Sequence, residues 1–219
     1  SRLEHEVFGP ILHVVRWRSD ELDKVCDAIA GTGFGLTLGI HSRIDSTVAH
    51  ICRRIEAGNV YVNRNIVGAV VGVQPFGGHG LSGTGPKAGG SFYLQRLSAG
   101  APWQMPPLSK TGEADDAALQ TMASLLAQMG FGHDAKVRLA AVLGESRVHT
   151  LRQAEMPLPG PTGERNSLSW HAPQRVWLYG GDLETAFAAL IRLAASGIRV
   201  QVLPVHPLAI WQEHAGQWL

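Results

Sequence analysis

The sequence lacks several features that mark specialised proteins. Among its 219 residues are only two cysteines, Cys26 and Cys52, too few for a disulfide framework, which favours a reducing, cytoplasmic setting. No apolar run approaches the ~20 residues of a membrane-spanning helix, and no signal-peptide pattern is visible. The formal net charge of +1 gives no electrostatic case for nucleic-acid binding. We therefore expect a cytoplasmic globular protein with no membrane span and no bound nucleic acid.

Several catalytic patterns are also missing. The ten histidines are scattered without metal-ligand spacing, so no metal site is predicted. Gly83-Thr84-Gly85 followed by Gly89 lacks the strand and the acidic residue of a dinucleotide fingerprint, and no Walker A pattern or nucleophile elbow is present. Both cysteines fall on apolar faces of predicted helices, where they are expected to be structural thiols. No catalytic residue is therefore predicted in this chain.

The most informative stretch is a long, glycine-rich segment with little charge, from Gly58 to Gly90. Loops longer than ~12–15 residues in compact domains are usually functional or disordered, and disorder needs a composition of low hydrophobicity. Apolar residues are spread through this segment: Ile66, Val67, Val70, Val71, Val73, Phe76 and Leu81. We interpret it as a buried loop packed against a site, with a core-packing loop that binds no ligand as the alternative.

Helical and strand patterns alternate along the chain. Apolar spacing and capping residues predict helices over 20–30, 45–57, 114–129, 134–143, 182–196 and from 207 to the end. Runs rich in β-branched residues predict strands over 11–17, 36–41, 60–63, 175–179 and 198–205. This alternation predicts an α/β architecture with a partly parallel sheet, and residues 175–205 form one predicted strand-helix-strand unit.

Five motifs carry a resemblance to a known family. Four of them resemble the cofactor-contacting motif and the C-terminal end of the aldehyde dehydrogenase catalytic domain. More closely, they resemble the L-glutamate-γ-semialdehyde (1-pyrroline-5-carboxylate) dehydrogenase module of the bifunctional proline utilization (PutA) family. The fifth resembles a segment in the C-terminal extension of long members of that family. The motifs are EVFGP at 6–10, GNVYVNR at 58–64, QPFGG at 74–78, LSGTGPKAGG at 81–90 and LPGPTGERN at 158–166.

The resemblance implies a division of the chain. Residues 1–97 would be the C-terminal portion of an aldehyde dehydrogenase catalytic domain, 98–160 a linker with helices, and 161–219 the truncated start of a Rossmann-like C-terminal extension. We therefore expect the chain to be a fragment of a longer polypeptide. In the family, the catalytic cysteine, the general-base glutamate and the Rossmann-type cofactor domain lie earlier in the protein.

The resemblance also assigns site residues. Glu6 would accept hydrogen bonds from the nicotinamide ribose, since a carboxylate offers two acceptor oxygens, and Phe8 would pack beside the nicotinamide ring. The backbone N–H groups of Gly89 and Gly90 would hold the substrate α-carboxylate, as consecutive amides can form an anion site, and Phe76 would line the aldehyde tunnel. The alternatives are a surface Glu and a core Phe at 6 and 8, a plain turn at 89–90 and a core aromatic at 76.

By this resemblance the parent protein oxidises L-glutamate γ-semialdehyde to glutamate with NAD⁺ in proline catabolism. Its FAD would lie in an upstream proline dehydrogenase module and would not be bound by this chain. The expected partners are the semialdehyde or glutamate, the upstream domains of the same polypeptide, and further copies in a homo-oligomer of the full protein. Two alternatives stay open: a non-catalytic lid or interaction module, and a fragment of another aldehyde dehydrogenase with a fused tail.

Overall fold

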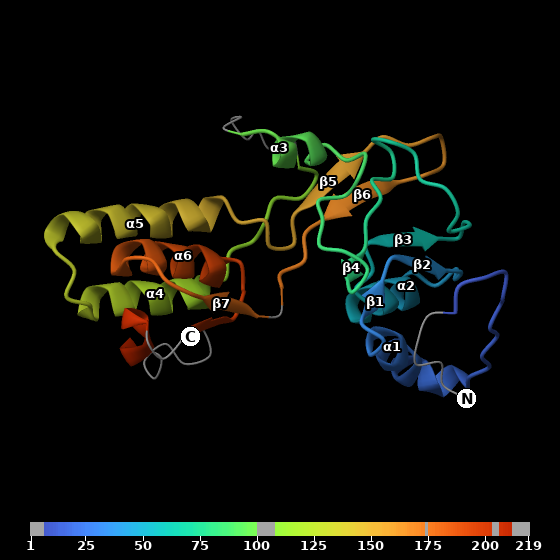
Figure 1. Cartoon of the computed structure of the whole chain (residues 1–219), viewed down its shortest axis with the longest axis horizontal. Helices are drawn as coiled ribbons and strands as arrows, with labels where there is room; N and C mark the ends of the chain where they lie inside the picture. Colours follow the sequence, from blue (N-terminus) through green and yellow to red (C-terminus); the bar gives the residue numbers. More distant parts are fainter. Residues whose placement is uncertain (1–6, 100–107, 174, 203–205, 212–219) are drawn as a thin grey trace. The chain divides into compact units, whose positions relative to one another are not determined.

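The computed structural model describes residues 7–99, 108–173, 175–202 and 206–211. The chain divides into two compact units (Figure 1). Unit 1 is drawn from residues 1–104 and 158–166, and unit 2 from residues 105–157 and 167–219. The sequence-based boundaries near 97 and 160, which refer to the intact protein, stay a prediction.

Unit 1 is built around two short parallel strands. Strands β2 (Thr37–Ile40) and β3 (Asn59–Val62) pair in register, with Ile40 opposite Val62. The 3₁₀ turn η1 (Ser19–Glu21) leads into α1 (Leu22–Ala30), which packs against α2 (Asp45–Arg54). Strands β1 (Phe34–Gly35) and β4 (His79–Gly80) form an antiparallel pair, and α3 (Tyr93–Leu97) follows the glycine-rich segment. Among the described side chains of this unit, those of Cys26, Ile40, Ile55 and Tyr61 are buried.

Two sequence predictions for unit 1 are corrected by the structure. Residues 11–17 form no strand, because no neighbouring strand among the described residues accepts their backbone hydrogen bonds, and their large apolar side chains are exposed. The second helix was expected to continue to residue 57 but ends at Arg54. Ile55 there adopts an extended backbone, with φ −114° and ψ 114°, and its side chain is buried. The helix expected over 20–30 is found as α1, Leu22–Ala30, and the parallel pairing of β2 with β3 agrees with the partly parallel sheet that was expected.

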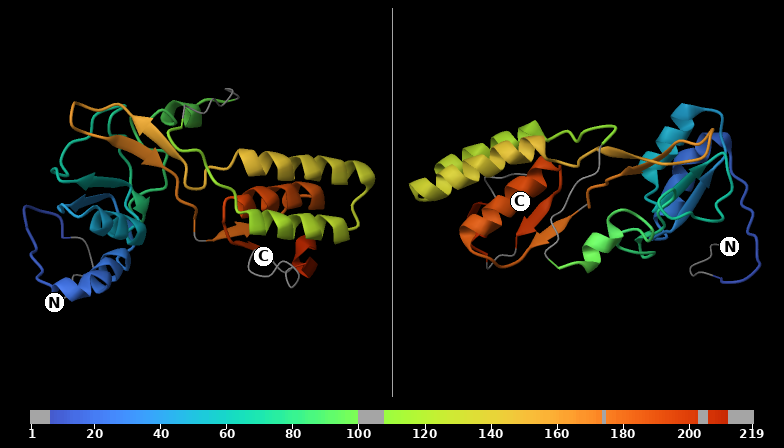
Figure 2. Two further views of the ribbon diagram at one scale, coloured as in Figure 1. Left: turned by 180° about the vertical axis from the view of Figure 1, so that it is seen from behind. Right: turned by 90° about the horizontal axis from the view of Figure 1, so that it is seen from above.

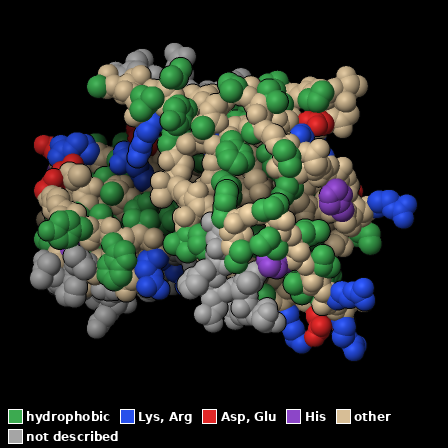
Figure 3. Space-filling model, turned by 45° about the vertical axis from the view of Figure 1, so that its right-hand side comes forward, with side chains coloured by type: hydrophobic (Ala, Val, Ile, Leu, Met, Phe, Trp, Pro, Cys, Tyr) green, Lys and Arg blue, Asp and Glu red, His purple; other side chains and the backbone are tan. Residues whose placement is uncertain are grey.

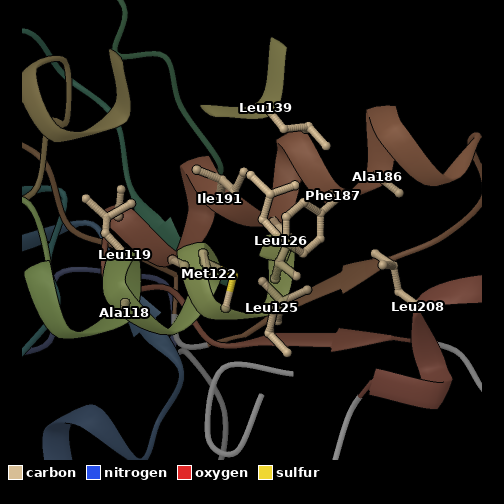
Figure 4. Close-up of a cluster of buried hydrophobic side chains, with 14 of the residues drawn as sticks. Ala118, Leu119, Met122, Leu125, Leu126, Leu139, Ala186, Phe187, Ile191 and Leu208 are labelled. Carbon is tan, nitrogen blue, oxygen red and sulfur yellow. The ribbon is translucent and has the colours of Figure 1, made fainter. Parts of the chain in front are cut away.

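Unit 2 is a helical layer with a short parallel sheet. Helices α4 (Asp116–Gln128), α5 (His133–Val148) and α6 (Leu183–Ala195) pack side by side (Figures 1 and 2). Side chains of α4 and α6 point toward one another and form the core shown in Figure 4, with Met122 and Phe187 almost fully buried. The helices expected within the linker 98–160 therefore share one hydrophobic core with the strand-helix-strand unit.

The strand-helix-strand prediction in unit 2 is confirmed. Strands β7 (Val176–Leu178) and β8 (Val200–Val202) are parallel, with α6 between them along the chain. Asp182 caps α6, because its carboxylate accepts a hydrogen bond from the Thr185 N–H at 3.0 Å. The helix expected from residue 207 begins as the 3₁₀ turn η2 (Pro207–Trp211), and its remainder lies outside the described residues.

One hairpin was not predicted. Strands β5 (Glu155–Leu158) and β6 (Asn166–Ser169) pair with each other. The sequence between them is rich in proline and glycine, a composition typical of a linker. The connecting residues, 159–165, belong to unit 1 together with the strand residues Leu158 and Asn166. Strands of four residues are too short to show a clear alternation of apolar and polar side chains. The proline and glycine residues between them were therefore the dominant feature of this part of the sequence.

Candidate substrate pocket

Unit 1 contains an apolar pocket of about 570 Å³. Its wall comes from the start of β2 and from two parts of the glycine-rich segment. The lining residues are Leu36, Thr37, Ile66, Gly68, Ala69, Val70, Val71, Gln74, Phe76, Ala88 and Gly89. None of these side chains carries a formal charge, so the pocket suits an apolar chain, and an anionic group would depend on backbone amides for its binding.

A tight turn shapes one wall of this pocket. The backbone N–H groups of Val73 and Gln74 both donate to the Val70 carbonyl, at 3.0 and 2.8 Å. The Gln74 side-chain Oε1 accepts a hydrogen bond from the Val70 N–H at 3.1 Å. The Gly72 N–H donates to the Gly89 carbonyl at 2.8 Å, which ties this turn to the opposite strand of the loop.

The structure separates the roles of the paired glycines. Gly89 lines the pocket with φ +69°, a left-handed conformation that favours glycine, and its N–H donates to no acceptor in the part of the chain that the structure describes. The Gly90 N–H donates to the Lys87 carbonyl at 3.2 Å, and Gly90 is outside the pocket lining. The Gly89 N–H is thus without an acceptor among the described residues, whereas the Gly90 amide takes part in a turn.

Phe76 is held at the pocket by its backbone. It exchanges two hydrogen bonds with Ala88, at 2.9 Å from the Phe76 N–H and 2.8 Å from the Ala88 N–H. Its side chain is 37% exposed. Phe76 is therefore partly exposed and lines the pocket, which is not the fully buried setting of a core aromatic.

The two residues expected to contact the cofactor are placed differently. Glu6 lies outside the described residues. Phe8 is 95% exposed and is not part of the pocket. The Phe8 ring is therefore free of contacts that would enclose it among the described residues. Figure 3 shows exposed hydrophobic side chains, coloured green, on one face of the molecule.

A polar network beneath the loop was missed by the sequence analysis. The buried Asn59 side chain donates to the Pro75 carbonyl at 2.9 Å and accepts from the Gly77 N–H at 3.1 Å. The Lys87 ammonium donates to the carbonyls of Gly58 and Gly77, the latter at 3.0 Å. Burial lowers the pKa of Lys87 below its ordinary value. The sequence signal for this network was the presence of Asn59 and a single lysine, Lys87, in a loop with almost no charge.

Neither cysteine has the setting of an activated nucleophile. Cys26 is buried, and burial raises the pKa of its thiol. The pKa of Cys52, which is half-buried, is raised for the same reason. A catalytic thiol needs a lowered pKa and access to solvent, and the pKa of each of these two thiols is shifted in the opposite direction.

The described residues hold no group of three or more His, Cys, Asp and Glu side chains placed to bind a metal ion. Among the helices that the structure describes, none has the length and apolar character needed to cross a membrane.

Comparison with known proteins relates the first part of the chain to a known family. Residues 1–99 match the aldehyde dehydrogenase family. The α/β fold predicted from the sequence is confirmed as an aldehyde dehydrogenase-family fold with helices and small sheets.

The similarity extends further to one kind of protein. Over 202 residues, the chain is 47% identical to the "Bifunctional protein PutA" of Rhizobium meliloti, covering 92% of this chain and 16% of that protein. It is 38% identical over 92 residues to the "1-pyrroline-5-carboxylate dehydrogenase" of Geobacillus kaustophilus, covering 42% of this chain and 18% of the relative.

A solved structure agrees with this similarity. The structure of proline utilization A from Corynebacterium freiburgense matches 93% of this chain and 20% of its own, with a TM-score of 0.61 and 27% identity. The resemblance to PutA proteins stated from the motifs is therefore confirmed. The chain spans 16% of the length of the PutA relative from Rhizobium meliloti.

Proposed function

We propose that this chain forms one wall of the substrate site of an NAD-dependent L-glutamate-γ-semialdehyde dehydrogenase within a PutA-type bifunctional protein. The parent protein would oxidise the semialdehyde to glutamate in proline catabolism. The observation that carries the proposal is the apolar pocket that contains both Phe76 and Gly89. Its support is the family match of residues 1–99 and the similarity to PutA and 1-pyrroline-5-carboxylate dehydrogenases.

The pocket suits the two ends of this substrate. The Gly89 N–H, which has no acceptor among the described residues, would donate a hydrogen bond to a carboxylate, because backbone amides bind anions without a side chain. The uncharged walls formed by Val70, Val71 and Ala88 suit the methylene groups between the carboxylate and the aldehyde. Phe76 lies in the same wall and would border the aldehyde end, while Gly90 supports the anchor through its turn.

Other parts of the site would come from polypeptide outside this chain. In the intact protein Glu6 and Phe8 would contact the nicotinamide ribose and ring, and further residues would have to enclose the cofactor. The thiol nucleophile would also come from outside, since both cysteines here have raised pKa values. FAD would belong to an upstream proline dehydrogenase module.

The proposal predicts that the isolated chain is inactive. Purified protein mixed with glutamate semialdehyde and NAD⁺ should produce no NADH above the rate of a buffer control. The intact parent protein, assayed in parallel, should produce NADH at an ordinary enzymatic rate. NADH formation by the isolated chain, abolished by Cys26→Ala or Cys52→Ala, would refute the assignment of the nucleophile to another segment.

A second candidate is a non-catalytic lid or interaction module. The exposed apolar side chains between residues 7 and 17 favour it, because free apolar surface of this kind marks contact with other polypeptide. Pull-down with the upstream dehydrogenase portion separates the candidates. Restored activity on mixing supports the catalytic wall, whereas binding without any change in activity supports the module.

The carboxylate anchor distinguishes this substrate from simpler aldehydes. Glutamate should compete with the substrate in the intact protein, and aliphatic monoacids of similar length should not. Gly89→Ala should weaken glutamate competition, because a Cβ at this left-handed position would lie 3.3 Å from Val71 and narrow the approach to the amide. Equal competition by both kinds of acid would favour another aldehyde dehydrogenase.

A further inference from the structure

Glu164 makes a set of contacts that the proposed function does not use. It lies in the loop between β5 and β6, far along the chain from the glycine-rich segment, yet within unit 1. Its carboxylate Oε1 accepts a hydrogen bond from the Arg64 Nη1 at 2.8 Å. Its Oε2 accepts one from the Gln74 Nε2 at 3.3 Å. One carboxylate therefore bridges two points of the glycine-rich segment.

The Gln74 contact leads directly to the pocket. Because Nε2 of Gln74 donates to Glu164, the amide is oriented with Oε1 toward the Val70 N–H, which donates to it at 3.1 Å. That bond closes the 70–74 turn, and Gly72 in the same turn donates to the carbonyl of Gly89. Three hydrogen bonds in series thus join Glu164 to the residue that offers its amide to the substrate.

The carboxylate itself is held in place. The Asn166 Nδ2 donates to the Pro159 carbonyl at 3.2 Å and lies 3.5 Å from the Glu164 Oε2. Arg64 is fixed from its other side, since its guanidinium carbon lies 5.2 Å from the centre of the Tyr61 ring. The side chains of Arg64 and Glu164 are 30% and 31% exposed, so solvent screens this pair less than a fully exposed one.

We propose that Glu164 is a positioning residue for the substrate pocket: through Gln74 it fixes the 70–74 turn and, with it, the Gly89 amide. The role of Gly89 toward a carboxylate rests on the proposed function, whereas the positioning of the turn does not. Glu164, which lies in the loop between β5 and β6, thereby sets the shape of the pocket wall that contains Phe76 and Gly89.

The first test needs no activity. Amide hydrogen exchange of the full 219-residue chain is followed by NMR for Glu164→Ala and for the unchanged protein. Exchange at Val70 and Gly72 should become about three- to tenfold faster in the variant, the change expected from losing one or two hydrogen bonds. The Gly77 amide, which is held by Asn59, should keep its rate and shows that the loop remains folded.

Glu184→Ala is a matched control. Glu184 pairs with Arg138 at 2.6 Å, its side chain is also 31% exposed, and it lies in unit 2. Its loss should leave Val70 and Gly72 unchanged. Glu164→Gln, which keeps oxygen acceptor capacity, should restore part of the protection. Unchanged exchange at Val70 and Gly72 in Glu164→Ala, or equal changes in both alanine variants, would overturn the proposal.

The second test uses the intact parent protein. Glu164→Ala should raise the KM for glutamate semialdehyde about three- to tenfold with a smaller change in kcat, because the variant loosens binding and leaves the reacting groups in place. Glu164→Gln should recover part of the KM. Faster amide exchange without a change in KM would support the role of Glu164 in positioning the turn. It would contradict the role of this pocket in binding the semialdehyde. The two proposals can therefore fail separately.

Discussion

The side-chain Oδ1 of Asn59 lies 3.3 Å from the Lys87 ammonium nitrogen, which donates to it. Together these two residues hold backbone groups of Gly58, Pro75 and Gly77. A loop with so few regular hydrogen bonds needs such side-chain partners, because buried backbone groups without a partner are costly. The network is therefore the support on which the pocket wall rests.

Removing the amide should destabilise unit 1. Asn59→Ala leaves the Pro75 carbonyl and the Gly77 N–H without their partner, so we expect the free energy of unfolding of this unit to fall by about 1–3 kcal/mol. Hydrogen exchange of β3 and Gly77 amides, measured across a urea series, gives this value. An unchanged exchange pattern would mean that the amide does not support the loop.

Lys87 should make unit 1 more stable as the pH rises. Burial lowers the folded pKa below the ordinary value of 10.5, so between the two pKa values the unfolded state binds more protons and stability increases with pH. Below the folded pKa, the free-energy cost of burying the Lys87 charge is present in full. This cost falls toward zero as the pH approaches 10.5.

The measurement is the difference between the unchanged chain and Lys87→Gln. Urea unfolding of unit 1 at pH 7 and pH 10 should show the unchanged chain gaining stability relative to the variant. A stability difference between the two proteins that is the same at pH 7 and pH 10, or that changes in the opposite direction, would contradict a lowered pKa of Lys87.

Gly58 should not tolerate a side chain. A Cβ built at this position collides with the backbone carbonyl of Gly77, and backbone cannot move aside as a flexible side chain can. Gly58→Ala should therefore destabilise unit 1 by about 1–3 kcal/mol, measured by the same urea-dependent exchange. Gly130→Ala is the control, since nothing lies within 4 Å of its Cβ position. Equal effects of the two substitutions would exclude steric contact as the cause.

Phe187 should dominate the core of unit 2. It is 1% exposed and lies against Phe131 with ring centroids 5.8 Å apart. Phe187→Ala should lower the free energy of unfolding of unit 2 by about 3–5 kcal/mol. Val137→Ala, at an exposed position on α5, should change it by less than about 0.5 kcal/mol. Thermal or urea unfolding followed by exchange of α6 amides distinguishes the two.

The helix ends that depend on neighbouring residues could be predicted from the sequence. Asp182 caps α6 as expected, and Gly31 ends α1, because capping and glycine termination depend on neighbouring residues. The segment 11–17 has a strand pattern but no strand, since a strand also needs a partner that the pattern does not supply. The β5–β6 hairpin was missed because its turn residues resemble those of a linker.

Only part of the candidate pocket could be predicted from the sequence, because most of its supporting contacts are not local. Motif resemblance selected Phe76 and Gly89, and the structure places both in one pocket. It could not select Asn59, Lys87 or Glu164, because their contacts join positions that are distant along the chain. Nor could it show that the Gly90 amide is used within a turn, which depends on the backbone conformation around Lys87.

The most direct measurement of the central claim is a crystal structure of the intact parent protein with glutamate bound. The account predicts glutamate in the pocket between Phe76 and Gly89, with an α-carboxylate oxygen about 2.7–3.2 Å from the Gly89 nitrogen. Glutamate bound elsewhere, with this pocket empty or filled by another segment, would contradict it.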